Sequence, residues 1–222
     1  ISLELLEIFD CPSITSFPAG HLPTTLKVLT IWNCCNLESL EDIATDSMSL
    51  ESLRIGNCTN LIFLPKCLNK LGCLDYLEID GCPGIVSFPQ GGLPSRSLKK
   101  LHILDCENLM FLPELMLSLT SLKELKLSNC PSIASLPDVG FPINLVSLEV
   151  KDCENITPLS KWGLHRLASL EKLKIHGGVL DVVFPEWLLP STLDTLHVGN
   201  LPKLKSLSPW LQHLSSLEDL KI

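Results

Sequence analysis

Cysteine offers the most chemistry in this chain, and its spacing is regular. A zinc site needs close cysteine pairs that face each other, but the near neighbours here are Cys34 with Cys35 and Cys67 with Cys73. Side chains stacked one strand apart, about 4.8 Å, would point in parallel, unlike those of a disulfide. Seven of the ten cysteines occupy one position of a repeated pattern: Cys11, Cys34, Cys58, Cys82, Cys106, Cys130 and Cys153. We predict buried thiols that pack as small apolar groups, without a metal or cofactor.

Residues that could carry catalysis do not form a recognisable set. Three of the six histidines fall at strand positions of different repeats: His102, His176 and His197. No serine or cysteine has a base and an orienting carboxylate in a motif for nucleophilic catalysis. The glycine pairs Gly91-Gly92 and Gly177-Gly178 lack the Gly-Lys-Thr/Ser of a phosphate-binding loop. The sequence therefore predicts that the chain is not an enzyme.

The elements that position these residues come from a repeat along the whole sequence. Each unit has a Leu, a second Leu three residues on, an Ile, Leu or Val two further, and usually a Cys three beyond. The first Leu of each unit is Leu3, Leu26, Leu50, Leu74, Leu98, Leu122, Leu145, Leu170, Leu193 and Leu217. The intervals of 23 to 25 residues are typical of leucine-rich repeats. We predict one array over residues 1–222, with about nine to ten repeats, truncated at both ends.

The pattern inside each unit predicts an α/β solenoid with the horseshoe architecture. Leu29 and Ile31 alternate at period two and so point together from a short strand into the core, and the strands stack into one parallel sheet on the concave face. From the fourth repeat on, the convex returns alternate between two kinds. Gly/Pro-rich returns follow Phe88, Leu136 and Phe184, and short helical turns pair Leu115 with Leu119, Leu164 with Leu167 and Leu211 with Leu214. Trp162, Trp187 and Trp210 fall in the returns, where we expect them to fill the convex side.

Charge and hydropathy bear on partners and location. The net charge of −8 gives no electrostatic reason to expect a nucleic-acid or anionic-membrane partner. No apolar run approaches the roughly 18 to 20 residues of a membrane span, and no signal peptide is evident. Many cysteines without a paired framework favour a reducing compartment, so we predict a cytoplasmic location, with the nucleus as a second possibility. The glycosylation patterns at Asn57 and Asn155 are discounted, because three-residue patterns recur by chance.

The outward strand positions are the candidate binding surface for a protein partner. Exposed aromatic side chains on a sheet are enriched where partners dock, and charged ones divide the face into an acidic N-terminal part and a basic C-terminal part. The predicted contact residues are Phe9, Trp32, Arg54, Tyr76, Glu78, Asp80, Lys99, Lys100, His102, Leu104, Lys123, Lys126, Lys151, Lys172, Lys174 and His176.

The repeat Leu-x-x-Leu-x-Ile-x-x-Cys-x-x-Leu-x-x-Leu-Pro resembles that of plant intracellular immune receptors of the nucleotide-binding leucine-rich-repeat family. Residues 30–34, Thr-Ile-Trp-Asn-Cys, and residues 88–95, Phe-Pro-Gln-Gly-Gly-Leu-Pro-Ser, resemble the coiled-coil subclass. Extracellular plant repeats usually carry Asn at the Cys position and a Gly-x-Ile-Pro that is missing here. The chain departs from the pattern at Gly178, Asp181 and Leu201.

The resemblance implies a sensor. It implies that this part recognises a pathogen effector or a guarded host protein, and helps to hold the receptor inactive by contacting the receptor's own nucleotide-binding domain. One alternative is the substrate-recruiting repeat of a ubiquitin ligase adaptor, which also uses this Cys but tends toward longer units. A second alternative is a secreted or cell-surface recognition array, which predicts oxidised or absent cysteines. A bare structural scaffold without a natural ligand is a third.

Overall fold

The computed structural model describes residues 2–17, 20–41, 43–44, 49–134, 140–156, 161–177, 189–199 and 210–222. Three positions that depart from the repeat pattern, Gly178, Asp181 and Leu201, lie outside these residues, as do Leu136, Phe184 and Trp187.

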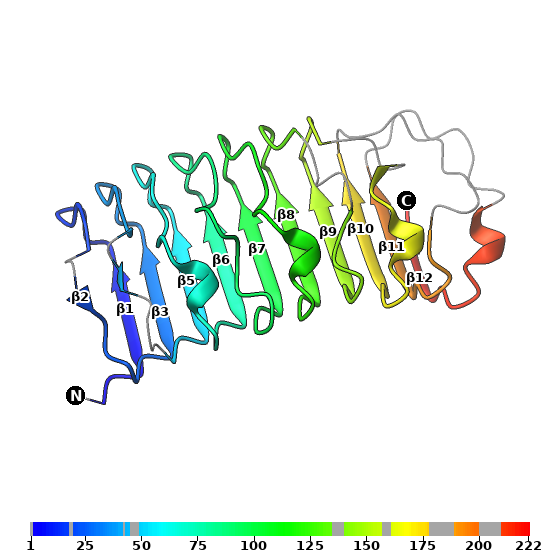
Figure 1. Ribbon diagram of the computed structural model, residues 1–222. Coiled ribbons are helices and arrows are strands. Elements are labelled where there is room, and N and C mark those ends of the chain that lie inside the picture. The colour runs from blue at the N-terminus through cyan, green and yellow to red at the C-terminus, as the bar shows by residue number, and fades with distance from the viewer. Residues whose placement is uncertain are drawn as a thin grey trace.

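One parallel sheet forms the frame of this described part (Figure 1). Its ten strands lie side by side in chain order, one from each repeat. They are β1 Leu5–Phe9, β3 Val28–Trp32, β5 Ser52–Gly56, β6 Tyr76–Asp80, β7 Lys100–Leu104, β8 Glu124–Ser128, β9 Ser147–Lys151, β10 Lys172–His176, β11 Thr195–Gly199 and β12 Asp219–Lys221. The predicted parallel solenoid is confirmed.

The register places identical repeat positions next to each other. Leu29 pairs with Leu53, Leu53 with Leu77 and Leu77 with Leu101, so each buried leucine packs between its two counterparts. The second and fourth residues of each central strand are almost fully buried, as the period-two pattern predicts. Burial of each such leucine contributes roughly 1.5–3 kcal/mol, and that contribution depends on the layers above and below.

The returns on the other side of the sheet contain short 3₁₀ helices in alternate repeats. Those in the described ranges are η1 Leu68–Lys70, η2 Met116–Ser118, η4 Leu164–Arg166 and η5 Trp210–His213. In Figure 1 they lie in front of the sheet, on the convex side. The predicted alternation is therefore present, and it begins one repeat earlier than the sequence suggested. A second ladder pairs β2 Gly20–His21 with β4 Ile43–Ala44 in the first returns.

One predicted return contact is wrong by one residue. Leu115 does not face the core: its side chain is 66 % exposed and its backbone is left-handed, with φ of 59°. Met116 is buried instead, together with Leu119. A 3₁₀ turn places residues three apart on one side, so the Met116–Leu119 pair replaces the four-residue spacing expected of an α-helical turn. Leu164 and Leu167 are buried as predicted.

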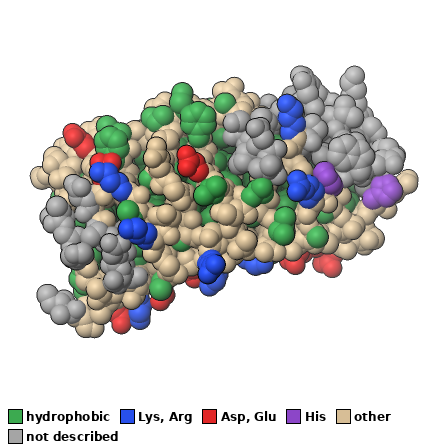
Figure 2. All heavy atoms as spheres, in the orientation of Figure 1, with side chains coloured by type: hydrophobic (Ala, Val, Ile, Leu, Met, Phe, Trp, Pro, Cys, Tyr) green, Lys and Arg blue, Asp and Glu red, His purple; other side chains and the backbone are tan. Residues whose placement is uncertain are grey.

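The outer face carries two further features. Trp162 is completely buried and makes an edge-to-face contact with Phe141 at 5.8 Å, so this tryptophan fills the convex side as predicted. Figure 2 shows this face, with hydrophobic side chains along its upper part. Exposed apolar residues of the returns after β5, β6 and β7 include Ile62, Val86 and Phe111.

A left-handed turn follows each strand of the ten-stranded sheet from β1 to β10, a regularity that the repeat pattern did not reveal. The residue after each strand has positive φ and is Asp, Asn or Gly: Asp10, Asn33, Asn57, Gly81, Asp105, Asn129, Asp152 and Gly177. These types tolerate that conformation best. Each backbone N–H donates to the last carbonyl of the neighbouring strand, as in Asp105 N–H to Ser128 O at 2.9 Å. The side-chain amide of Asn129 also donates to the Asp105 carboxylate at 2.7 Å.

The recurring cysteines form a stack beneath these turns. Six are buried and Cys11 is half-buried. Each thiol donates to the carbonyl two residues earlier, as in Cys106 Sγ to Leu104 O at 3.2 Å. Burial raises the pKa of Cys34, and hydrogen bonding to the Cys130 thiol together with burial raises the pKa of Cys153. Cys34 and Cys153 therefore stay protonated and poorly nucleophilic, whereas the hydrogen bond with the Cys82 thiol lowers the pKa of buried Cys58 to about 7.

Titration of the native protein with a thiol reagent such as DTNB is expected to divide the cysteines into two groups. Cys35, Cys67 and Cys73 are half-buried or exposed and should react first, followed by Cys11. The six buried thiols of the stack should react only after guanidinium denaturation, because burial makes them inaccessible to the reagent. Rapid native modification of Cys82 or Cys106, identified by mass spectrometry, would contradict this packing.

Candidate functional site

All sixteen predicted contact residues lie on, or immediately before, the strands that form the concave face. Fourteen of them occupy the first, third or fifth position of a strand, and Lys99 and Lys123 immediately precede β7 and β8. Alternation along each strand places the fourteen strand residues opposite the buried leucines, whereas Lys99 and Lys123 are exposed just before the first strand position. Rows of outward side chains therefore cross the sheet from β1 to β12.

A connected network occupies the middle of this face, over β5 to β8. The Arg54 guanidinium lies 5.0 Å from the centre of the Tyr76 ring, a cation–π geometry, and Arg54 Nε is 3.6 Å from Glu78 Oε2. The Tyr76 hydroxyl hydrogen-bonds His102 Nδ1 at 3.1 Å, and His102 Nε2 hydrogen-bonds Glu124 Oε1 at 2.9 Å. Four neighbouring strands thus hold these side chains in fixed orientations.

Burial and pairing set the charge states of Tyr76 and Glu124 in this network. Burial, with a hydrogen bond and charge from Glu78, raises the pKa of Tyr76 to about 12, so its hydroxyl stays protonated at neutral pH. Burial alone would raise the pKa of Glu124, but hydrogen bonding and charge from His102, with Lys100 3.5 Å away, lower it overall. A protonated tyrosine beside an ionised, already paired glutamate can offer hydrogen bonds to a partner.

Glycines make room for two rings on this face. The indole of Trp32 in β3 lies against Gly56 of β5, where an added Cβ would overlap it. The His176 ring in β10 lies against Gly199 of β11 in the same way. Phe9 in β1 pairs in register with Trp32 and remains 48 % exposed, so the first strands present an aromatic surface.

Carboxylates neutralise most cations on and beside the sheet strands from β1 to β8. Lys27 contacts Glu4 at 3.0 Å, Lys99 contacts Asp75 at 3.3 Å, and Lys126 contacts Glu149 at 3.6 Å. Burial, with charge from Asp105 and Glu78, raises the pKa of Asp80. The predicted division into acidic and basic parts is therefore softened in the middle of the sheet, because acidic and basic side chains of adjacent strands pair.

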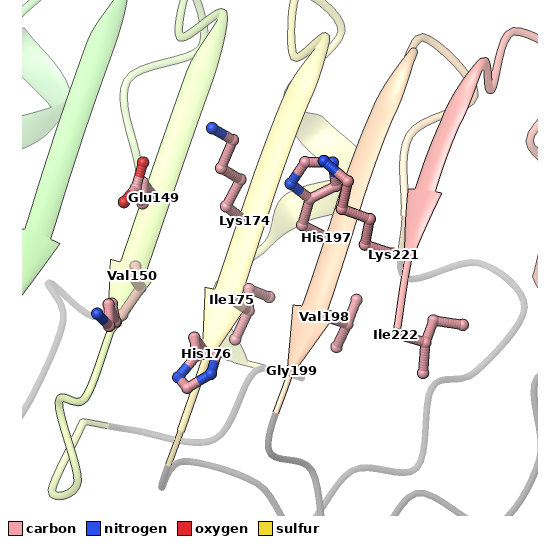
Figure 3. A pocket seen from close by; sticks show the side chains of 11 residues that line it. Glu149, Val150, Lys174, Ile175, His176, His197, Val198, Gly199, Lys221 and Ile222 are labelled. Atoms are coloured by element: carbon pink, nitrogen blue, oxygen red, sulfur yellow. The ribbon is translucent and has the colours of Figure 1, made fainter.

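The basic part extends further than the sequence analysis proposed. A hollow of about 390 Å³ lies over β9 to β12 and includes two residues missed as contacts, His197 and Lys221 (Figure 3). His197 Nε2 lies 2.6 Å from Asp219 Oδ2. Gly56 and Gly199, which make room for the two rings, were not among the predicted site residues either. The sequence signal that could have identified them is a glycine at the last position of a strand. Among the described residues, no group of three His, Cys, Asp or Glu could hold a metal ion.

Comparisons with known proteins support the repeat fold. No family model matches the chain. It is 38 % identical over 237 aligned residues to a candidate disease resistance protein of Arabidopsis thaliana, an alignment that covers 93 % of this chain and 17 % of that protein. The leucine-rich-repeat domain of the type III effector XopL superposes with a TM-score of 0.59 at 24 % identity, over 90 % of this chain and 77 % of that one. The fold is thus that of leucine-rich repeats. In the described ranges, no helix is long and apolar enough to cross a membrane.

Replacement of Gly56 by alanine should destabilise the protein by about 1–3 kcal/mol, because the new methyl group displaces the Trp32 indole. In a Trp32→Ala background the same substitution should cost less than about 0.5 kcal/mol, since nothing remains to displace. Urea unfolding of the four proteins measures the difference. Gly72→Ala is the matched control, because the space around Gly72 is open. Equal costs of Gly56→Ala in both backgrounds would show that the ring does not lie there.

Acidification should weaken the network through Glu124. Its pKa is lower in the folded protein than the ordinary 4.5, so its contribution to stability is complete above that value and is lost as pH falls through the folded pKa. The unfolding free energy of Glu124→Gln should therefore fall less steeply below about pH 4.5 than that of the parent protein. Glu107→Gln, at an exposed position outside the network, should keep the parental slope.

Proposed function

We propose that this chain is the protein-recognition part of an intracellular plant immune receptor, of the coiled-coil subclass of nucleotide-binding leucine-rich-repeat proteins. The whole chain would act as one repeat array that senses a pathogen effector or a guarded host protein. The similarity to a candidate disease resistance protein supports this role, although the chain spans 17 % of the length of that relative.

The observation that carries the proposal is the arrangement of the concave face. Aromatic, cationic and anionic side chains from separate repeats lie on one rigid sheet, and several are held by neighbours, as Tyr76 is by Arg54 and His102. Side chains ordered before binding lose less conformational entropy when a partner docks. Exposed Phe9 and half-buried Trp32 add the apolar contact area that protein interfaces use. We assign the sixteen concave residues to this interface as a proposal.

Recognition would control activity through differential contacts. The concave face would bind the receptor's own nucleotide-binding domain in the resting state and the sensed protein in the active state. A partner shifts this equilibrium only as far as its affinity for the two states differs. The proposed part is not an enzyme and needs no cofactor. Its thiol stack suits the reducing cytoplasm or nucleus.

Concave substitutions in the complete receptor test this function. The variant Phe9→Ser, Arg54→Glu, Lys126→Glu should change cell-death signalling in leaves by at least about fivefold, upward through lost autoinhibition or downward through lost sensing. A variant with Ile143→Ser, Lys161→Glu and Arg166→Glu on the returns is the matched control, since all three residues are exposed. The proposal fails if the concave variant accumulates normally and signals as the parent does, both at rest and when challenged.

A further inference from the structure

The lysines of the described concave strands that have no carboxylate partner lie together at one place; Lys123, which also has none, precedes β8. Arg54, Lys100 and Lys126 each lie within 4.0 Å of a carboxylate of an adjacent strand. Among the described residues, Lys151, Lys172 and Lys174 have none, and Lys174 is half-buried. A chain of net charge −8 thus keeps uncompensated positive charge on two neighbouring strands, β9 and β10.

The hollow over β9 to β12 contains two of these lysines. Figure 3 shows Glu149, Lys174, His197 and Lys221 in a row across four strands, with His176 in the row below. The carboxylates nearby are already engaged: Glu149 contacts Lys126 at 3.6 Å, and Asp219 contacts His197 at 2.6 Å and Lys221 at 3.7 Å. No carboxylate of the hollow therefore neutralises Lys174.

The spacing of the free cations matches an extended peptide. Lys172 and Lys174 are two residues apart on β10 and point to the same side, so their Cα atoms are separated by about 6.8 Å. Acidic residues at every second position of an extended chain have the same repeat. Lys151 on β9 lies diagonally beside Lys174, which pairs in register with Glu149. Lys151 and Lys174 line the hollow, and Lys172 lies next to it on the same face of β10.

We propose that the hollow over β9 to β12 binds an extended acidic segment of a protein partner, with carboxylates at alternate residues paired to Lys172, Lys174 and Lys151. This assignment rests on the proposed recognition function and specifies the partner chemistry at one end of the concave face. Neutralisation of a half-buried lysine favours complex formation, and charge complementarity accelerates encounter.

Fluorescence anisotropy with the complete protein tests the proposal. The probe is a labelled peptide with glutamate at every second position, and the reference peptide has the same composition with its glutamates consecutive. Lys151→Glu, Lys172→Glu, Lys174→Glu should weaken binding of the alternating peptide by at least about tenfold. Lys66→Glu, Lys161→Glu, Arg166→Glu, which changes the net charge equally on the returns, should change it by less than about twofold. Raising salt from about 0.05 to 0.5 M should weaken binding to the parent protein at least about fivefold, a measurement that needs no variant.

Several results would overturn the acidic-peptide assignment. They are equal binding of both peptides, equal loss in both triple variants, binding insensitive to salt, or tighter binding of duplex DNA or phosphatidylserine vesicles. The receptor assay separates this proposal from the wider function. Peptide binding that needs the three lysines, in a receptor whose Phe9→Ser, Arg54→Glu, Lys126→Glu variant signals normally, contradicts the recognition function but not the hollow. Signalling that needs them without peptide binding contradicts the peptide assignment alone.

Discussion

In-register stacking of identical repeat positions is the constraint on which the rest of this structure depends. Each strand buries its second and fourth side chains against the same positions of its two neighbours, as Leu77 does between Leu53 and Leu101. Adjacent parallel strands lie close to 4.8 Å apart, so each layer must be as thick as the next. Small cysteines and left-handed Asp, Asn or Gly turns satisfy this requirement at the end of the strand. Stability is therefore shared between neighbouring repeats and does not reside in one central cluster.

The same register shapes the concave surface. Residues far apart in sequence become direct neighbours, so Tyr76, His102 and Glu124 form one hydrogen-bonded chain across β6, β7 and β8. Where two bulky side chains would meet, a glycine replaces one of them, as at Gly56 beneath Trp32. Where cations exceed carboxylates, as on β9 and β10, charge remains available to a partner. A rigid frame thus allows each repeat to present different chemistry.

Leucine spacing was sufficient to predict the parallel sheet and which strand residues point away from the core, because period-two alternation determines which side chains share a face. It was insufficient for Leu115, since Leu115 and Met116 both fit an apolar spacing to Leu119 and only the left-handed backbone at Leu115 decides between them. The hydrogen-bond chain from Tyr76 to Glu124 was also out of reach, because it depends on side-chain rotamers on different strands. The left-handed turns had a visible signal, the Asp, Asn or Gly after each strand, which the leucine pattern obscured.

The alternation of returns implies that the structural unit is two repeats long. Leu115 and Gly163 occupy equivalent left-handed positions before η2 and η4, and Pro94, Pro142 and Pro190 each accept a backbone hydrogen bond from the leucine that opens the following unit. A helical return thus has irregular returns as neighbours, with which its buried side chains pack, as Trp162 packs on Phe141. Insertion or deletion of a single repeat would bring two returns of one kind together. We therefore expect arrays of this type to lengthen and shorten during evolution by even numbers of repeats.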